Sequence, residues 1–153
     1  MTVRVSVSMV GARRLAAVRR QIPIGAVGSA WRPALDQVWT FLRDRPGLRT
    51  DGHNIFLYHR QTANDALITA DFGVEVTRSF ETSGEVHMTE TPAGEVATAI
   101  HVGGYDRLGE THRAVTAWAE AHRRTLAGQY WEIYGDWSDD PSALETTILY
   151  LLK

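Results

Sequence analysis

The chain repeats one order of secondary structure twice, and this duplication constrains the fold more than any other feature. Each half contains a strand, a glycine-containing loop, a helix with tryptophan in its apolar stripe, and two further strands. The segments LAAVRRQIPIG…LDQVWTFL and VATAIHVGGY…HRAVTAWA follow this order in the first and second halves. The pattern predicts an α+β domain of tandem β-α-β-β repeats, repeat one at about 1–78 and repeat two at about 84–153.

In the first half, valines at every second position predict a half-buried strand over residues 2–9, which Gly11 interrupts. An extended strand at 15–20 and a loop at 22–25 follow. We predict that Ser29 caps a helix with Pro33 in its first turn, where the missing N–H is tolerated. The remaining predicted elements are a strand at 54–60, a polar loop at Gln61–Asp65 and a strand at 67–77.

In the second half, strands are expected at 85–89 and 95–102, joined by the turn Thr91-Pro92-Ala93-Gly94. A helix over 105–124 should bury Leu108, Val115, Trp118 and Ala119. Strands at 128–137 and 145–152 should close as a hairpin around the Asp139-Asp140-Pro141-Ser142 turn.

The length, charge and amino-acid composition of the chain exclude several classes of protein. A chain of 153 residues with 44% hydrophobic residues is one globular domain with a sizeable core. Its net charge of −2 disfavours a general nucleic-acid binder, and the lack of cysteine excludes disulfides and thiolate sites. No segment is typical of a signal peptide or a membrane span, so a cytoplasmic protein is expected.

The most unusual stretch is Gly128–Trp137, GQYWEIYGDW. Alternation along a strand places Tyr130, Glu132 and Tyr134 on one face, with Trp131 and Ile133 on the other. Glutamate is uncommon in strand centres, and a carboxylate between aromatic rings must recover its lost hydration from a partner. Glu132 is therefore the first candidate for a functional residue.

The order of these motifs resembles the GyrI-like small-molecule-binding domain, the effector-binding module of AraC-type and MerR-type transcription activators, which also occurs alone. The matching segments are His101-Val102-Gly103-Gly104-Tyr105, Trp131-Glu132-Ile133-Tyr134 and the closing strand 145–150. The resemblance implies two modules about a pseudo-two-fold axis, with antiparallel sheets and two main helices around a central cleft. It also implies that Glu132 reaches into this cleft, where the family commonly binds cationic ligands.

On this basis we expect a small aromatic or lipophilic, cationic ligand, bound for sequestration or for effector sensing. Glu132 could act as the counter-charge, or as a general acid or base if burial raised its pKa; both uses are compatible with the sequence. The expected wall residues are Tyr130, Tyr134, Tyr58, Tyr105, Trp31 and Phe56.

Two other classes follow from the resemblance. One is a hydrolase that opens cyclopropane rings, with Glu132 as its catalytic residue; the other is a gyrase-inhibitor type of interaction module, for which the acidic Asp136–Asp140 loop would suit a protein partner. Direct DNA binding is not expected, because the chain begins with the first strand. The six histidines lack metal-site spacing, and neither a metal nor a cofactor is expected. His101 is interpreted as a polar residue at a strand end.

Overall fold

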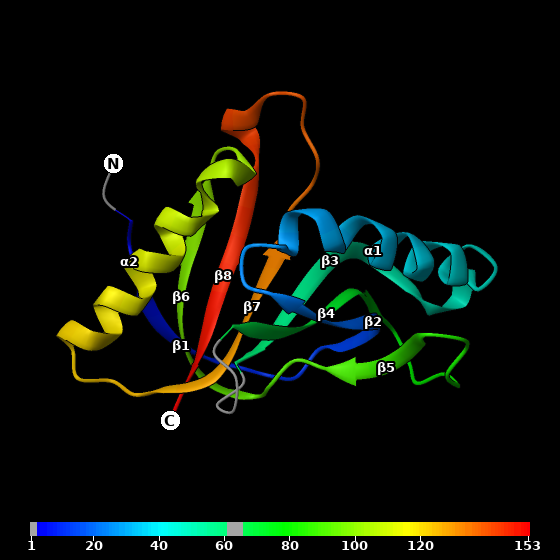
Figure 1. Cartoon of the computed structure of the whole chain (residues 1–153), viewed down its shortest axis with the longest axis horizontal. Coiled ribbons are helices and arrows are strands. Elements are labelled where there is room, and N and C mark those ends of the chain that lie inside the picture. The colour runs from blue at the N-terminus through cyan, green and yellow to red at the C-terminus, as the bar shows by residue number, and fades with distance from the viewer. Residues whose placement is uncertain (1–2, 61–65) are drawn as a thin grey trace. The chain divides into compact units, whose positions relative to one another are not determined.

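The computed structural model describes residues 3–60 and 66–153, without the side chains of residues 51 and 52 (Figure 1). The predicted polar loop Gln61–Asp65 lies outside the described residues. The chain divides into two compact units. Unit 1 consists of Met1–Gly11 and Pro92–Lys153, and unit 2 consists of Ala12–Thr91.

Unit 2 is an antiparallel sheet with one long helix packed on it. Its helix α1 (Val27–Arg43) contacts β2 (Arg14–Pro23) and β4 (Leu67–Val76). The sheet order is β3-β4-β2-β5, in which β3 is Arg49–Arg60 and β5 is Val86–Glu90. A short turn of 3-10 helix, η1 (Pro46–Leu48), joins α1 to β3. The helix residues buried in this unit are Ala34, Leu35, Val38, Phe41 and Leu42.

Unit 1 has the same plan. Its helix α2 (Leu108–Ala121) lies along β6 (Gly94–Val102) and β8 (Glu145–Leu152), as Figure 1 shows. The sheet order is β1-β6-β8-β7, in which β1 is Ser6–Val10 and β7 is Leu126–Tyr134. The 3-10 turns η2 (Tyr105–Arg107) and η3 (Pro141–Ala143) precede α2 and β8. An α+β fold built from antiparallel sheets and two main helices is therefore confirmed.

The first strand of each half belongs to the unit that the other half forms. Strand β1 pairs with β6, and Ser6 lies opposite Thr98. Strand β5 pairs with β2, and Val18 lies opposite Val86. Both sheets thus have one topology, β5-β2-β4-β3 in unit 2 and β1-β6-β8-β7 in unit 1, with the edge strands exchanged.

Small residues allow close packing in both units. In unit 1, Ala97 and Ala99 on β6 pack with Val115 of α2 and with Ile148 and Tyr150 of β8. In unit 2, Gly73 lies against β2 so closely that an added Cβ would stand 2.8 Å from the carbonyl oxygen of Ala16. Any larger residue at position 73 would therefore separate β4 from β2.

The structure corrects three predictions. Helix α1 begins at Val27 after Ala26, so Ser29 is not the N-cap and Pro33 lies inside the helix. Strand β1 is not half-buried: as an edge strand it leaves Met9 74% exposed. Strands β5 and β6 flank the predicted turn but pair with strands distant in sequence, β5 with β2 and β6 with β1 and β8.

Candidate functional site

Glu132 lies near the end of β7, on the face of the unit 1 sheet that α2 covers. The β7–β8 hairpin forms as predicted, with Tyr130 opposite Tyr150 and Glu132 opposite Ile148. Only 5% of Glu132 is exposed, although most glutamates in folded proteins lie in water. A carboxylate at such a position requires hydrogen-bond donors.

Two side chains supply these donors. His112 of α2 places its Nε2 2.7 Å from Oε2 of Glu132. The Tyr134 hydroxyl donates a hydrogen bond to the other oxygen, Oε1, also at 2.7 Å. Both oxygens of the carboxylate are therefore bound within unit 1, one from the helix and one from the strand that carries it.

The hydrogen bonds also fix the chemistry of the His112 ring. An ionised carboxylate only accepts hydrogen bonds, so Nε2 must carry the proton that faces Glu132. The opposite nitrogen, Nδ1, lies 2.7 Å from the Tyr150 hydroxyl, which donates to it when the ring is neutral. A continuous hydrogen-bonded chain thus runs from Tyr150 through His112 and Glu132 to Tyr134.

Aromatic rings surround this chain. Tyr130 and Tyr150 stack with centroids 4.7 Å apart and an interplanar angle of 7°. The His112 ring meets Tyr130 edge to face at 5.8 Å. Beyond Tyr134, Tyr105 of η2 lies edge to face at 5.5 Å. The electron-rich faces of such rings attract cations, and their area favours apolar surface.

Tyr134 remains a hydrogen-bond donor over a wide pH range. Burial raises the pKa of Tyr134 well above the value of an ordinary tyrosine, and the neighbouring Glu132 carboxylate raises this pKa further. Both effects disfavour a second negative charge beside the carboxylate. Tyr134 therefore stabilises Glu132 as a neutral donor and does not compete with it for a cation.

The predicted candidates fall into two groups. Unit 1 brings together Glu132, Tyr130, Tyr134 and Tyr105 through the contacts above. The other three belong to unit 2, where Phe56 and Tyr58 of β3 are buried and Trp31 of α1 is partly buried. Trp31 contacts Phe56 at a centroid distance of 6.0 Å, and Phe56 packs edge to face on Phe72.

Sequence reasoning missed two members of the chain, His112 and Tyr150. A signal for His112 was present, because it falls between Leu108 and Val115 in the stripe of α2 that was predicted to be buried. A histidine in an apolar stripe needs a polar partner on the facing strand. Tyr150 could be found only from the hairpin register, which places it opposite Tyr130.

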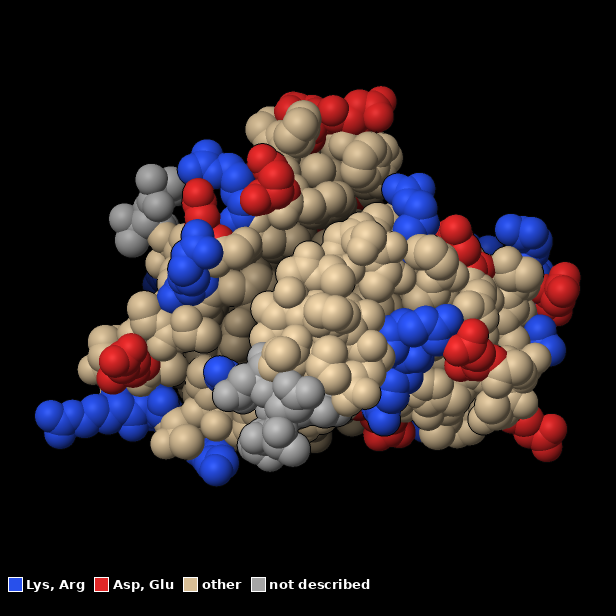
Figure 2. Space-filling model, in the orientation of Figure 1, with Lys and Arg blue, Asp and Glu red and all other residues tan. Residues whose placement is uncertain are grey.

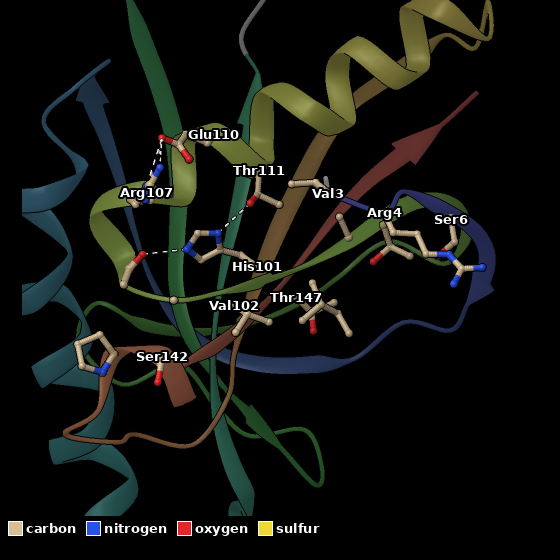
Figure 3. Close-up of a pocket in the computed structure, with 16 residues that line it drawn as sticks. Val3, Arg4, Ser6, His101, Val102, Arg107, Glu110, Thr111, Ser142 and Thr147 are labelled. Atoms are coloured by element: carbon tan, nitrogen blue, oxygen red, sulfur yellow. Dashed lines mark hydrogen bonds and ion pairs between the residues drawn. The ribbon is translucent and has the colours of Figure 1, made fainter. Parts of the chain in front are cut away.

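His101 is buried near the end of β6. Its Nδ1 lies 2.8 Å from the Thr111 hydroxyl and its Nε2 lies 2.8 Å from the Gly104 carbonyl oxygen. Figure 3 shows the ring held between these two groups in a groove of about 860 Å³ on unit 1. None of the candidate residues lines this groove, and the exposed Arg107 at its edge is paired with Glu110.

Three remaining features of the described residues concern metals, membranes and the acidic loop. Within residues 3–60 and 66–153, no group of three or more histidine and carboxylate side chains is placed to hold a metal ion. No helix in these ranges has the length and apolarity to cross a membrane. Acidic side chains gather over the β7–β8 connection (Figure 2), where Asp140 accepts hydrogen bonds from Ser142 and thereby orders η3.

Comparison with known proteins agrees with the fold. The sequence model of the GyrI-like small molecule binding domain matches residues 4–152. The C-terminal domain of EcmrR is 21% identical with a TM-score of 0.81, covering 100% of this chain and 99% of that domain. No curated protein matches the chain.

Two other solved structures share the fold at lower identity. SAV2435, solved bound to tetraphenylphosphonium, is 10% identical with a TM-score of 0.74, and the match covers 98% of this chain and 94% of SAV2435. A hydrolase encoded by lin2189 from Listeria innocua is 12% identical with a TM-score of 0.65, covering 98% and 92% of the two chains. At these identities the similarity establishes the fold alone.

Proposed function

Because the chain belongs to the GyrI-like small-molecule-binding family, we propose that it binds a small aromatic or lipophilic cation beside Glu132, for sequestration or effector sensing. The observation that carries the proposal is a buried carboxylate in a cluster of tyrosines. Glu132 is 5% exposed and accepts from Tyr134, and its other partner, His112, contacts the stacked rings of Tyr130 and Tyr150. A buried charge is costly unless it is paired and hydrogen-bonded, and a bound cation would supply a charged partner.

The arrangement suits a lipophilic cation on energetic grounds. A unit charge about 5 Å from the carboxylate gains roughly 3 kcal/mol at an effective dielectric constant of about 20. Each tyrosine face adds about 0.5–2 kcal/mol when the contact is desolvated. A neutral ligand of equal shape gains the apolar contact but lacks the first contribution, so charge should distinguish the two ligands.

The similar structures support this class of ligand. SAV2435 was solved with tetraphenylphosphonium, a permanent cation with four aromatic rings. The EcmrR–DNA complex has a TM-score of 0.80 to this chain at 20% identity, and the match covers 57% of that regulator.

The experiment is a binding titration of tetraphenylphosphonium and of neutral triphenylphosphine oxide, followed by calorimetry and thermal shift. We expect the cation to bind the wild type and to raise its melting temperature by mass action. Glu132→Gln should weaken cation binding about 100-fold, the equivalent of roughly 3 kcal/mol. The exposed Glu110→Gln is the matched control and should bind as the wild type does.

If the cation and the neutral compound bind equally, or if Glu132→Gln binds the cation unchanged, charge recognition at Glu132 is wrong. Circular dichroism of each variant establishes that it folds before its affinity is compared. The substitution keeps the size of the side chain and its oxygen acceptor for Tyr134. Its amide N–H faces Nε2 of His112, which accepts it when the neutral ring adopts the other tautomer and Nδ1–H donates to the Tyr150 hydroxyl.

One observation favours a second candidate, a hydrolase. The His112–Glu132 pair and the Tyr134 hydroxyl provide a carboxylate with proton donors within 2.7 Å, an arrangement suited to activating water. The similar Listeria protein is a hydrolase. Incubation with a cyclopropane-containing alkylating agent would yield the ring-opened, water-added product, and Glu132→Gln should lower that rate about 10²–10⁴-fold. Equal rates in both proteins would reject this candidate.

A further inference from the structure

His112 gives the carboxylate of this site a resident partner that can carry the same charge as the proposed ligand. Its Nε2 lies 2.7 Å from Oε2 of Glu132, and the exposed fractions of the two side chains are 18% and 7%. With the ring protonated, the pair is an ion pair without net charge. With the ring neutral, the pair keeps the single negative charge of the carboxylate.

The surrounding groups satisfy the ring in both states. When His112 is neutral, the Tyr150 hydroxyl donates to Nδ1; when His112 is charged, Nδ1 donates to the same hydroxyl oxygen at the same 2.7 Å. Nε2 donates to Glu132 in either state. Addition of a proton therefore reorients one hydroxyl and breaks no hydrogen bond of His112 that the structure shows.

The groups that face His112 leave Glu132 as the acidic partner. On β7 they are Glu132 and Tyr130, and on β8 the facing group is Tyr150. Behind Glu132 lies Tyr134, and behind that ring lies Tyr105 of η2. Apart from the Glu132 carboxylate, all of these groups are tyrosine phenols. Histidine is the residue type that ordinarily changes charge between about pH 5 and 8.

We propose that His112 couples occupancy of this site to a proton, so that binding of a permanent cation beside Glu132 displaces the proton from His112. The inference rests on the proposed cation-binding function. A protonated imidazole neutralises the carboxylate and repels a second cation, whereas a neutral imidazole leaves the charge of Glu132 to the ligand. His112 is thus a specificity-determining residue that makes cation affinity depend on pH.

Thermodynamic linkage gives the direction in which cation affinity changes with pH. A ligand that binds the form with neutral His112 binds more weakly as pH falls, because protons compete with it. With one proton displaced, affinity should fall by up to about tenfold per pH unit on the acidic side of the His112 titration. On the alkaline side the affinity should become constant.

The test uses the full chain and tetraphenylphosphonium, whose charge does not change with pH. Affinity is measured by calorimetry from pH 5 to 8.5 for wild type, His112→Gln and His122→Gln. The glutamine side chain of the His112→Gln variant has no ionisable ring but retains an N–H donor for Glu132. His122 is the matched control on the C-terminal end of the same helix, where its Nδ1 lies 2.8 Å from the Trp118 carbonyl oxygen.

We expect wild type and His122→Gln to lose affinity steeply toward pH 5, while His112→Gln shows a flat profile. Wild-type binding near the midpoint should release a proton, detected as a dependence of the binding enthalpy on the ionisation enthalpy of the buffer. Histidine ring NMR of the wild type gives a second readout that needs no variant, since the His112 titration should shift to lower pH when the cation is bound.

Binding of tetraphenylphosphonium to the wild type with equal affinity across this range, or without proton release, would overturn the inference and leave the proposed function standing. The same holds if His112→Gln keeps the pH profile of the wild type. Failure of the cation to bind at any pH would overturn the proposed function itself, and this inference with it.

Discussion

Asp71 joins all four strands of the unit 2 sheet through one carboxylate. It lies on β4 and is fully buried, and Arg19 of β2 donates two hydrogen bonds to it at 2.9 Å each. His59 of β3 contacts it at 2.9 Å, and His87 of β5 lies 3.5 Å from it. A buried charge with this many donors stabilises the fold only while it is ionised.

The acid stability of the protein should depend on this residue. Burial alone would raise the pKa of Asp71, but the hydrogen bonds from His59 and Arg19 outweigh burial and lower the pKa to about 2. A lowered pKa contributes stability that is present above about pH 4 and is lost as pH falls toward 2, here about 2 kcal/mol. Urea unfolding at pH 5 and pH 2.5 measures this loss.

Asp71→Asn should be destabilised at pH 5 by about 1–3 kcal/mol, because it leaves donors of Arg19 and His59 with a weaker acceptor. It should then lose less stability than the wild type between pH 5 and pH 2.5. The exposed Asp139→Asn serves as the control and should follow the wild type. An equal acid-induced loss in Asp71→Asn and wild type would contradict the assignment.

At the scale of elements, the start of α1 provides a matched pair of glycines. Gly25, in the loop before the helix, has a φ of +96°, a conformation that residues with a side chain rarely adopt, whereas Gly28 lies in the first turn of α1. A Cβ added at either position meets no described atom within 4 Å. The two positions therefore differ in backbone conformation and not in available space.

Gly28→Ala should stabilise the protein by about 0.5–1 kcal/mol, because alanine is the better helix former and restricts the unfolded chain. Gly25→Ala should destabilise it by about 1 kcal/mol or more, because of its positive φ. Thermal unfolding of the two variants tests both directions. The account of this helix start would be wrong if both substitutions changed the melting temperature in the same direction.

The elements also show what sequence could predict. Strand β8 and the β7–β8 hairpin were predicted because alternation and the Asp-Asp-Pro-Ser turn are local signals. The start of α1 was misplaced because Ser29 has cap chemistry, but its hydroxyl donates to the carbonyl oxygen of Ala26 instead. Glu132 was found from its strand, whereas His112 required knowledge of which helix face meets which strand.

At the scale of the whole molecule, the exchange of β1 and β5 could not be read from the sequence. Both strands lie beside a turn that suggests a local hairpin, yet each pairs with a strand of the other half. Arg13 and Thr91, which lie near the two ends of unit 2, are joined by two hydrogen bonds. The Thr91 N–H donates to the Arg13 carbonyl oxygen, and the Arg13 N–H donates to the Thr91 hydroxyl oxygen. Periodicity identifies a strand but not its partner.

The exchange of strands β1 and β5 predicts which strand loses protection when the N-terminal residues are removed. A chain without residues 1–11 should lose protection from hydrogen exchange in β6 at those amides of residues 94–98 that point toward β1, whereas the amides that point toward β8 keep their partner. Strand β2, at residues 14–23, follows directly in sequence but should remain protected, because it pairs with β4 and β5. Hydrogen-exchange mass spectrometry of the full chain and of the shortened chain tests this prediction. Faster exchange in β2 with unchanged exchange in β6 would refute the pairing of β1 with β6.

The exchanged strands also set the order of events on the ribosome. Strand β1 is synthesised well before its partner β6, which begins at Gly94, and before β8, the next strand of that sheet, which ends at Leu152. At about 5–20 residues per second, roughly 4–17 s pass between the end of β1 and the beginning of β6. The last strand that the sheet of unit 2 needs is β5, which ends at Glu90. This sheet can therefore be complete before β6 is synthesised. During translation, unit 2 can therefore fold while β1 is still unpaired, and the sheet of unit 1 can be completed only after β8 has been made.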